Sequence, residues 1–225
     1  SNEIWIPSDT DIAPSNAKQY SINWNGQFLK SMFATECNVY YKEMANLITF
    51  KDGYTSIRGD DQWKQKIATH GVGTSYGLEL FIRKQKGDWQ GFTGYSYSHT
   101  TRTFAQTNQG KTFIFDYDRP HSFSIAILRK FSDTWSISGT WVYQSGLPYT
   151  PVLGRQSAIG LNFDNEYVVY ESLIYGERNS GRMKPYHRLD LGITHTSTNK
   201  HNQRCEWNFS IYNAYNRKNP YYYYY

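Results

Sequence analysis

The chain has 225 residues, of which 39% are hydrophobic and 18% aromatic, with a formal net charge of +5. The mean hydropathy is −0.72, and no stretch approaches the run of about 18 apolar residues that a membrane-spanning helix requires. Basic residues are scattered along the chain and form no stripe, which argues against a nucleic-acid partner. The 21 Tyr and 7 Trp are typical of proteins with an aromatic belt at a membrane interface.

An alternation of large apolar and small polar side chains predicts eight antiparallel strands and requires no helix. One clear example places Phe123, Ile125 and Ile127 on one face and Ser122 and Ser124 on the other. Successive side chains of a strand point to opposite faces, so each strand is expected to separate two different solvents. The predicted strands lie near residues 18–25, 33–44, 74–84, 89–100, 121–129, 135–144, 187–196 and 206–215.

The connections between these strands are alternately short and long. Tight polar turns are expected near Gly26 and at 86–88, 132–133 and 199–202. The long connections cover about 27 residues from Ala45, roughly 20 from Thr101 and about 40 over 146–185. Outer-membrane β-barrels show this asymmetry, with short periplasmic turns and long extracellular loops.

A soluble β-sandwich is the alternative, because its strands also alternate in polarity. Against it, the polar face here carries Ser, Thr, Asn, Gln and Gly in place of the Lys and Glu of a soluble surface. Two charged pairs fall on this face, Glu79 with Arg83 and Arg188 with Asp190. We interpret them as solvated ion pairs that line a wet wall. The predicted fold class is therefore all-β, an antiparallel transmembrane β-barrel.

Several segments, taken in order, resemble the barrel of TonB-dependent outer-membrane receptors of the Bacteroidota. Each segment alone is weak, but the ordered series spans nearly the whole chain. The segments are YYKEM at 40–44, SYGLE at 75–79, YDRPH at 117–121, WVYQSGLPYT at 141–150, YGERN at 175–179, YHRLDL at 186–191 and FSIYNAYNRKNPY at 209–221.

The resemblance implies a 22-stranded barrel with a plug domain in its lumen. Eight strands cannot build that wall, so residues 1–225 are expected to be a C-terminal portion, from the fourteenth strand to the penultimate one. The plug domain, the TonB-contacting segment, the first strands and the last strand have no counterpart in this sequence. The chain also begins without a secretion signal, which suggests a mature product or a fragment. The expected location is the outer membrane, in contact with its lipid.

The long connection 146–185 is the predicted ligand-binding region, because loops on a rigid scaffold often carry recognition. Its candidate residues are Tyr149, Arg155, Tyr175, Arg178 and Arg182. Arginine would bind an anionic iron chelate or a peptide carboxylate through charge-assisted hydrogen bonds, and tyrosine rings would stack on sugars. The alternative interpretation is that Arg178 and Arg182 brace the loop on the barrel.

No motif for bond-breaking chemistry, a metal or a cofactor occurs in the sequence, so an enzyme is not expected. The leading hypothesis is energised uptake, driven through TonB, of a scarce solute such as a siderophore, an oligosaccharide or a peptide. The second hypothesis is a receptor-like barrel that serves as a structural scaffold in an outer-membrane complex with a surface lipoprotein.

Overall fold

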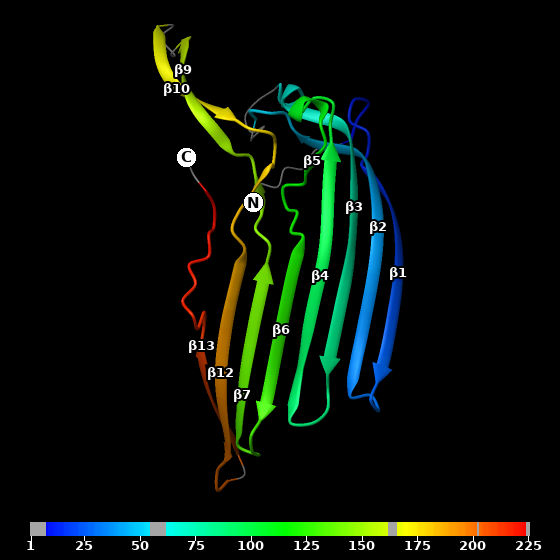
Figure 1. Ribbon diagram of the computed structural model, residues 1–225, viewed down its shortest axis with the longest axis vertical. Coiled ribbons are helices and arrows are strands. Elements are labelled where there is room, and N and C mark those ends of the chain that lie inside the picture. The colour runs from blue at the N-terminus through cyan, green and yellow to red at the C-terminus, as the bar shows by residue number, and fades with distance from the viewer. Residues whose placement is uncertain (1–7, 55–61, 162–165, 202, 224–225) are drawn as a thin grey trace.

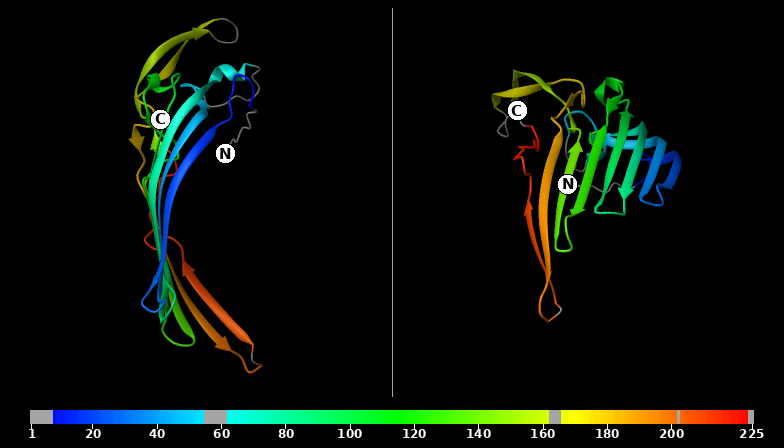
Figure 2. Two further views of the ribbon diagram at one scale, coloured as in Figure 1. Left: turned by 90° about the vertical axis from the view of Figure 1, so that its right-hand side faces the viewer. Right: turned by 60° about the horizontal axis from the view of Figure 1, so that its bottom comes forward.

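The computed structural model describes residues 8–54, 62–161, 166–201 and 203–223. Eight long strands form one curved antiparallel sheet, in the order β1-β2-β3-β4-β6-β7-β12-β13 (Figures 1 and 2). The eight predicted strands are all present. Their bounds are β1 Asn16–Phe28, β2 Phe33–Phe50, β3 Ile67–Lys84, β4 Trp89–Thr103, β6 His121–Lys130, β7 Trp135–Gln144, β12 Tyr186–Thr198 and β13 Arg204–Ile211, and the short β5 Phe113–Ile114 pairs with β4.

The strand register lines up the apolar side chains into one continuous surface, here called the outer face. Ile22 of β1 lies opposite Val39 of β2, which lies opposite Leu78 of β3. Ile22 is 77% exposed and Val39 is 49% exposed, which a water-soluble sheet would avoid by packing a second layer on them. The other two sheets in the described part of the chain have two strands each, so a sandwich does not form.

The opposite surface, here called the inner face, is hydrogen-bonded and polar. A hydrogen bond between the hydroxyls of Ser75 and Thr100 joins β3 to β4, with Oγ and Oγ1 2.8 Å apart. The predicted pair Arg188–Asp190 forms, with Nη2 and Oδ2 2.8 Å apart. Glu79, in contrast, accepts a hydrogen bond of 2.9 Å from Asn38, so its predicted pairing with Arg83 is replaced by a bond across to β2.

The two ends of the sheet differ, as the lengths of the connections predict (Figure 1). At one end, the short-turn rim, hairpins join β1 to β2, β3 to β4, β6 to β7 and β12 to β13. The first of these turns uses positive φ angles at Leu29, Lys30 and Ser31, of 51°, 52° and 59°. The long connections gather at the other end, the long-loop rim.

Several predicted boundaries are wrong. The turn expected near Gly26 lies at residues 29–32, because Gly26 pairs with Thr35 within the β1–β2 ladder. The strand expected from residue 74 begins at Ile67. The connection expected from Ala45 starts later, because β2 and β3 stay paired beyond an irregularity at Asn46, whose φ is +55°. The last strand was expected to reach residue 215 but ends at Ile211, where Asn213 takes a φ of +54° and its backbone N–H donates to Asp190 Oδ1 at 2.9 Å. The cap on Asn213 comes from a neighbouring strand, so a local pattern does not reveal it.

The connections also hold structure that the alternation does not predict. The described connections include two short 3₁₀ turns, Trp63–Lys66 and Asn108–Gly110, and the architecture remains all-β, as the alternation predicts. Within 146–185, β8 Pro148–Tyr149 pairs with β11 Gly181–Arg182, and β9 Val152–Leu161 pairs with β10 Tyr167–Tyr175. This β9–β10 hairpin projects from the long-loop rim (Figure 1). No helix in the described residues has the length and hydropathy to cross a bilayer.

The largest buried side chains of the described residues lie beneath the long-loop rim. Phe104 and Phe113 stack with ring centroids 6.2 Å apart and pack with Ala68 and Leu47. A Cβ on Gly71 would come within 2.2 Å of the Phe104 ring. Only glycine therefore fits at this position of β3 next to the ring. This small core supports the loops that form the candidate site.

Candidate ligand-binding cleft

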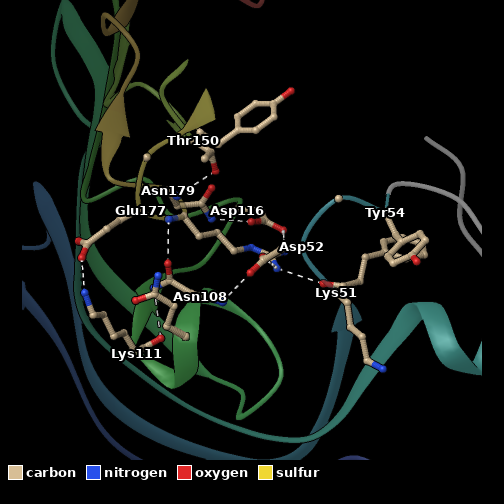
Figure 3. A pocket seen from close by; sticks show the side chains of 15 residues that line it. Lys51, Asp52, Tyr54, Asn108, Lys111, Asp116, Thr150, Glu177 and Asn179 are labelled. Atoms are coloured by element: carbon tan, nitrogen blue, oxygen red, sulfur yellow. Dashed lines mark hydrogen bonds and ion pairs between the residues drawn. The ribbon is translucent and has the colours of Figure 1, made fainter. Parts of the chain in front are cut away.

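A cleft of about 810 Å³ lies at the long-loop rim, between segments that are far apart in the sequence (Figure 3). Three connections build it, residues 50–54 after β2, residues 108–116 after β4, and residues 175–179 after β10. Its volume falls within the range of small-molecule sites, about 300–1,000 Å³. We therefore treat it as the candidate binding site of this chain.

Arg178 joins the three connections. Its guanidinium donates to the Phe50 carbonyl and to Thr49 Oγ1, each at 3.1 Å, and lies 4.7 Å from the Phe113 ring centroid. Its backbone N–H donates to Asn108 Oδ1 at 3.0 Å. With its side chain only 17% exposed, Arg178 is held by these contacts inside the protein.

Asn179 forms the second anchor and is 7% exposed. Its side-chain amide donates to the Ile114 carbonyl at 2.7 Å and to Asp116 Oδ1 at 2.5 Å, and its backbone N–H donates to Thr150 Oγ1 at 3.1 Å. Its φ of +56° lies in the left-handed region, which Asn tolerates better than most residues. The turn thus depends on this residue type for both its backbone and its contacts.

A buried ion pair lies close to the cleft. Arg182 Nη2 is 2.8 Å from Asp118 Oδ2, and Arg182 Nη1 donates to the Asp118 and Gly146 carbonyls. The Asp118 side chain is fully buried and also accepts the backbone N–H of Thr100 at 2.8 Å. Because a buried carboxylate needs partners for all its lone pairs, this pair fixes the loops to β4.

The cleft walls carry equal numbers of positive and negative groups. Lys51, Lys111 and Arg178 supply the cations, and Asp52, Asp116 and Glu177 supply the anions. Lys111 Nζ lies 2.7 Å from Glu177 Oε1, and this hydrogen bond, aided by the positive charge, holds the pKa of the Glu177 carboxyl below its ordinary value. A balanced site of this kind suits a polar or zwitterionic solute better than a polyanion.

The structure brings together only part of the predicted set. Tyr175 and Arg178 line the cleft, and Arg182 lies in the ion pair with Asp118. Arg155 instead forms an exposed pair with Glu171 on the β9–β10 hairpin, at 2.9 Å. Tyr149 lies in β8 and packs edge-on against Tyr223, with centroids 5.3 Å apart. Neither Arg155 nor Tyr149 is among the residues that line the cleft.

The other cleft residues were not predicted as site residues. Within the connection 146–185 they are Thr150, Gly176, Glu177 and Asn179. The two other connections contribute Phe50, Lys51, Asp52, Gly53, Tyr54, Asn108, Gln109, Lys111 and Asp116. The available signal was the acidic residue Asp116, which directly precedes the segment at 117–121. The described residues contain no group of three or more His, Cys, Asp or Glu side chains placed to hold a metal ion.

Comparison with known proteins agrees with this architecture. The family model described as "TonB dependent receptor-like, beta-barrel" matches residues 2–216. No curated protein matches the chain by sequence.

Solved structures share the fold at low sequence identity. The ferripyoverdine receptor of the Pseudomonas aeruginosa outer membrane, bound to ferripyoverdine, has a TM-score of 0.56 at 16% identity, over 92% of this chain and 24% of that one. The pyoverdine receptor FpvA from P. aeruginosa PAO1, bound to pyoverdine, has a TM-score of 0.58 at 15% identity, over 92% of this chain and 26% of that one. The chain thus spans about a quarter of the length of these receptors.

Proposed function

Because the chain belongs to the TonB-dependent receptor β-barrel family, we propose that it forms part of the wall of an energised outer-membrane importer. The family consists of outer-membrane transport receptors and not of enzymes. The observation that carries the proposal is a single curved sheet with an apolar outer face, a polar inner face and a loop-built cleft at one rim. Such a wall needs lipid on one side and water on the other.

Residues 1–225 are the C-terminal portion of a 22-stranded barrel in this proposal, and β1 to β13 supply its fourteenth to twenty-first strands. In the described residues β1 and β13 are not paired with each other, and an unpaired edge in lipid would cost several kcal/mol per group. Other strands are expected to cover both edges. The order of the sequence segments from 40–44 to 209–221 supports a receptor of the Bacteroidota type.

The proposed solute is scarce and too large for open porins, such as a siderophore, an oligosaccharide or a peptide. The cleft at the long-loop rim contributes part of its outer binding surface. Tyr54 and Tyr175 line this cleft and are 46% and 60% exposed. Lys66 Nζ lies 5.6 Å from the Tyr54 ring centroid, and the exposed parts of both rings are accessible to a solute, unlike the internally bonded Arg178. Energy for release into the periplasm would arrive through TonB and the plug.

The test is uptake of labelled candidate solutes by cells that express the complete receptor, with and without TonB. We expect TonB-dependent uptake of one solute, and at least a tenfold weaker binding of it in Tyr54→Ala/Tyr175→Ala, since a stacking contact is worth about 1 kcal/mol or more per ring. Tyr167→Ala, an 82% exposed tyrosine outside the cleft, is the control. Uptake independent of TonB, or equal losses in both variants, would reject the proposal.

The β9–β10 hairpin favours a second function, a scaffold that holds a surface lipoprotein. Leu153, Ile159 and Val169 are 70%, 71% and 71% exposed on it, and a two-stranded hairpin is marginally stable without a partner. Deletion of the hairpin should then release a co-purifying lipoprotein from the receptor. A receptor that purifies without any lipoprotein in mild detergent, from its own outer membrane, would reject this function.

A further inference from the structure

A second, smaller hollow lies on the outer face near the short-turn rim, on the opposite end of the sheet from the cleft. It has a volume of about 210 Å³, and strands β2, β3, β4 and β6 contribute to it. Its outward-facing lining includes Phe33, Ile82, Trp89, Gly91 and Ile127. This lining is apolar, and the hollow lies on the surface that faces membrane lipid.

Gly91 creates the hollow. It lies between Lys84 on β3 and Ile127 on β6 in the register, where its neighbours on the outer face carry long side chains. A Cβ at this position would come within 2.2 Å of the Ala126 carbonyl oxygen. The strands are therefore too close here for any side chain, and a furrow remains between Lys84 and Ile127.

Two cations lie beside the hollow on the same face. Lys84 lines it, and its ammonium lies 6.0 Å from the Phe33 ring centroid. Two of its three N–H groups donate to carbonyls of the β3–β4 turn, that of Lys86 and that of Trp89, the latter at 2.7 Å, which leaves one donor for a ligand. Arg129 lies opposite Trp89 in the register, and its guanidinium is 4.8 Å from the Trp89 ring centroid and 4.9 Å from that of Phe131.

Neither cation is neutralised by the protein. No carboxylate of the described residues lies within 4.0 Å of Lys84 or Arg129, and the Arg129 guanidinium donates no hydrogen bond to the part of the chain that the structure describes. Contacts with two aromatic rings use the π-faces of those rings and do not neutralise the positive charge. A cation with free donors at a membrane surface requires an anionic acceptor or water.

We propose that this outer-face site binds one anionic phospholipid. An acyl chain lies in the furrow over Gly91, and the phosphate receives hydrogen bonds from Lys84 and Arg129. Aromatic side chains lie along the same rim, as expected at the headgroup level of a membrane. The ring centroids of Phe28 and Phe33 are 5.1 Å apart, and those of Trp135 and His195 are 4.4 Å apart. This binding goes beyond solute uptake, because it involves the opposite rim and the lipid side of the wall.

The experiment is native mass spectrometry of the complete receptor in detergent, titrated with phosphatidylglycerol or with phosphatidylethanolamine of the same acyl chains. The test variant is Lys84→Gln/Arg129→Gln. The control is Arg83→Gln/Lys130→Gln, which removes two cations from the same strands, one residue away and on the inner face. Each variant is judged to have folded when heating changes its mobility on gels in the same way as it changes that of the wild type.

We expect wild type and control to bind one phosphatidylglycerol more tightly than phosphatidylethanolamine. The test variant should lose roughly thirtyfold in affinity for phosphatidylglycerol, as two basic groups near a membrane surface predict. Three results would overturn the proposal. They are equal affinity of wild type for both lipids, equal losses in test and control variants, and complete displacement of the lipid by the chain-free headgroup glycerophosphoglycerol at the same concentration. The wild-type comparison decides the matter even if a variant does not fold.

Discussion

The wall and the long-loop rim are held together by different kinds of contact. In the wall, every strand pairs with its neighbour in sequence or with the next long strand, and the outer face carries mainly apolar side chains, such as Ile22 and Phe209. In the rim, side chains from separate connections meet. Arg178, for example, bonds to Thr49 and Asn108, 129 and 70 residues away in sequence.

The difference shows that the two regions depend on different forces. In the proposed barrel, the wall is stabilised where its outer face meets lipid and where neighbouring strands pair their backbone groups. The rim depends on a few buried polar groups, each of which is costly when it loses its partner. The stability cost of a substitution should therefore depend on its depth in the membrane when it lies in the wall. In the rim, the cost should depend on the individual contacts that the substitution removes.

The largest expected effect is in the rim, from Arg182→Ala. This change leaves the fully buried Asp118 carboxylate without its cation, at an expected cost of about 3 kcal/mol in the free energy of unfolding. Urea unfolding of the receptor in detergent, followed by tryptophan fluorescence, measures it. Arg155→Ala, which breaks an exposed pair, should cost less than about 1 kcal/mol. Similar losses in the two variants would contradict the assignment of Arg182 as the brace.

The next effect is in the wall, from Ile125→Arg on the outer face. A charge that faces the bilayer is expected to cost about 2–3 kcal/mol. Thr140→Arg places the same charge on the inner face, opposite Asp190 in the register, and should be nearly neutral. Folding of both variants into lipid vesicles, across a urea series, compares them. If Thr140→Arg were the more costly, the two faces would be assigned the wrong way round.

A smaller effect separates backbone from side-chain contributions in the rim, at Asn179. Asn179→Ala loses the two hydrogen bonds that the side-chain amide donates and strains a positive φ; the backbone N–H bond to Thr150 Oγ1 is still available. Its expected cost is about 2 kcal/mol. Asn179→Gly keeps the backbone conformation and should cost less by about 1 kcal/mol. Equal midpoints of thermal unfolding for the two variants would show that the left-handed backbone contributes nothing.

The smallest effect is a pH dependence at Lys111–Glu177. Because the folded-state pKa of Glu177 is lowered, the pair stabilises the protein fully above the ordinary carboxyl pKa, and this contribution is lost as the pH falls through the lowered value. Between pH 7 and pH 3, thermal unfolding should therefore shift down less in Lys111→Gln than in wild type. An identical acid-side shift in both proteins would mean that the exposed pair contributes no stability.

Local patterns were sufficient for the strands and not for the rim. The alternation at Phe123, Ile125 and Ile127 correctly predicts β6 because a strand exposes its two faces in turn. The same reasoning failed at Ala45, where pairing continues past a bulge, and at Asn213, where a cap from Asp190 ends the strand. In the cleft, it found Tyr175 and Arg178 but not Asp52 or Asn108, which reach the site from other connections.

The sequence by itself determined that this protein is an all-β wall with two unlike faces and two unlike rims, since side-chain polarity repeats every second residue and turn lengths are local properties. The tertiary structure alone decided that Arg178 is bonded within the protein, that Arg155 lies away from the cleft, and that Gly91 leaves a furrow beside Lys84. These features arise where strands and loops distant in the chain come into contact, and no spacing along one segment contains that information.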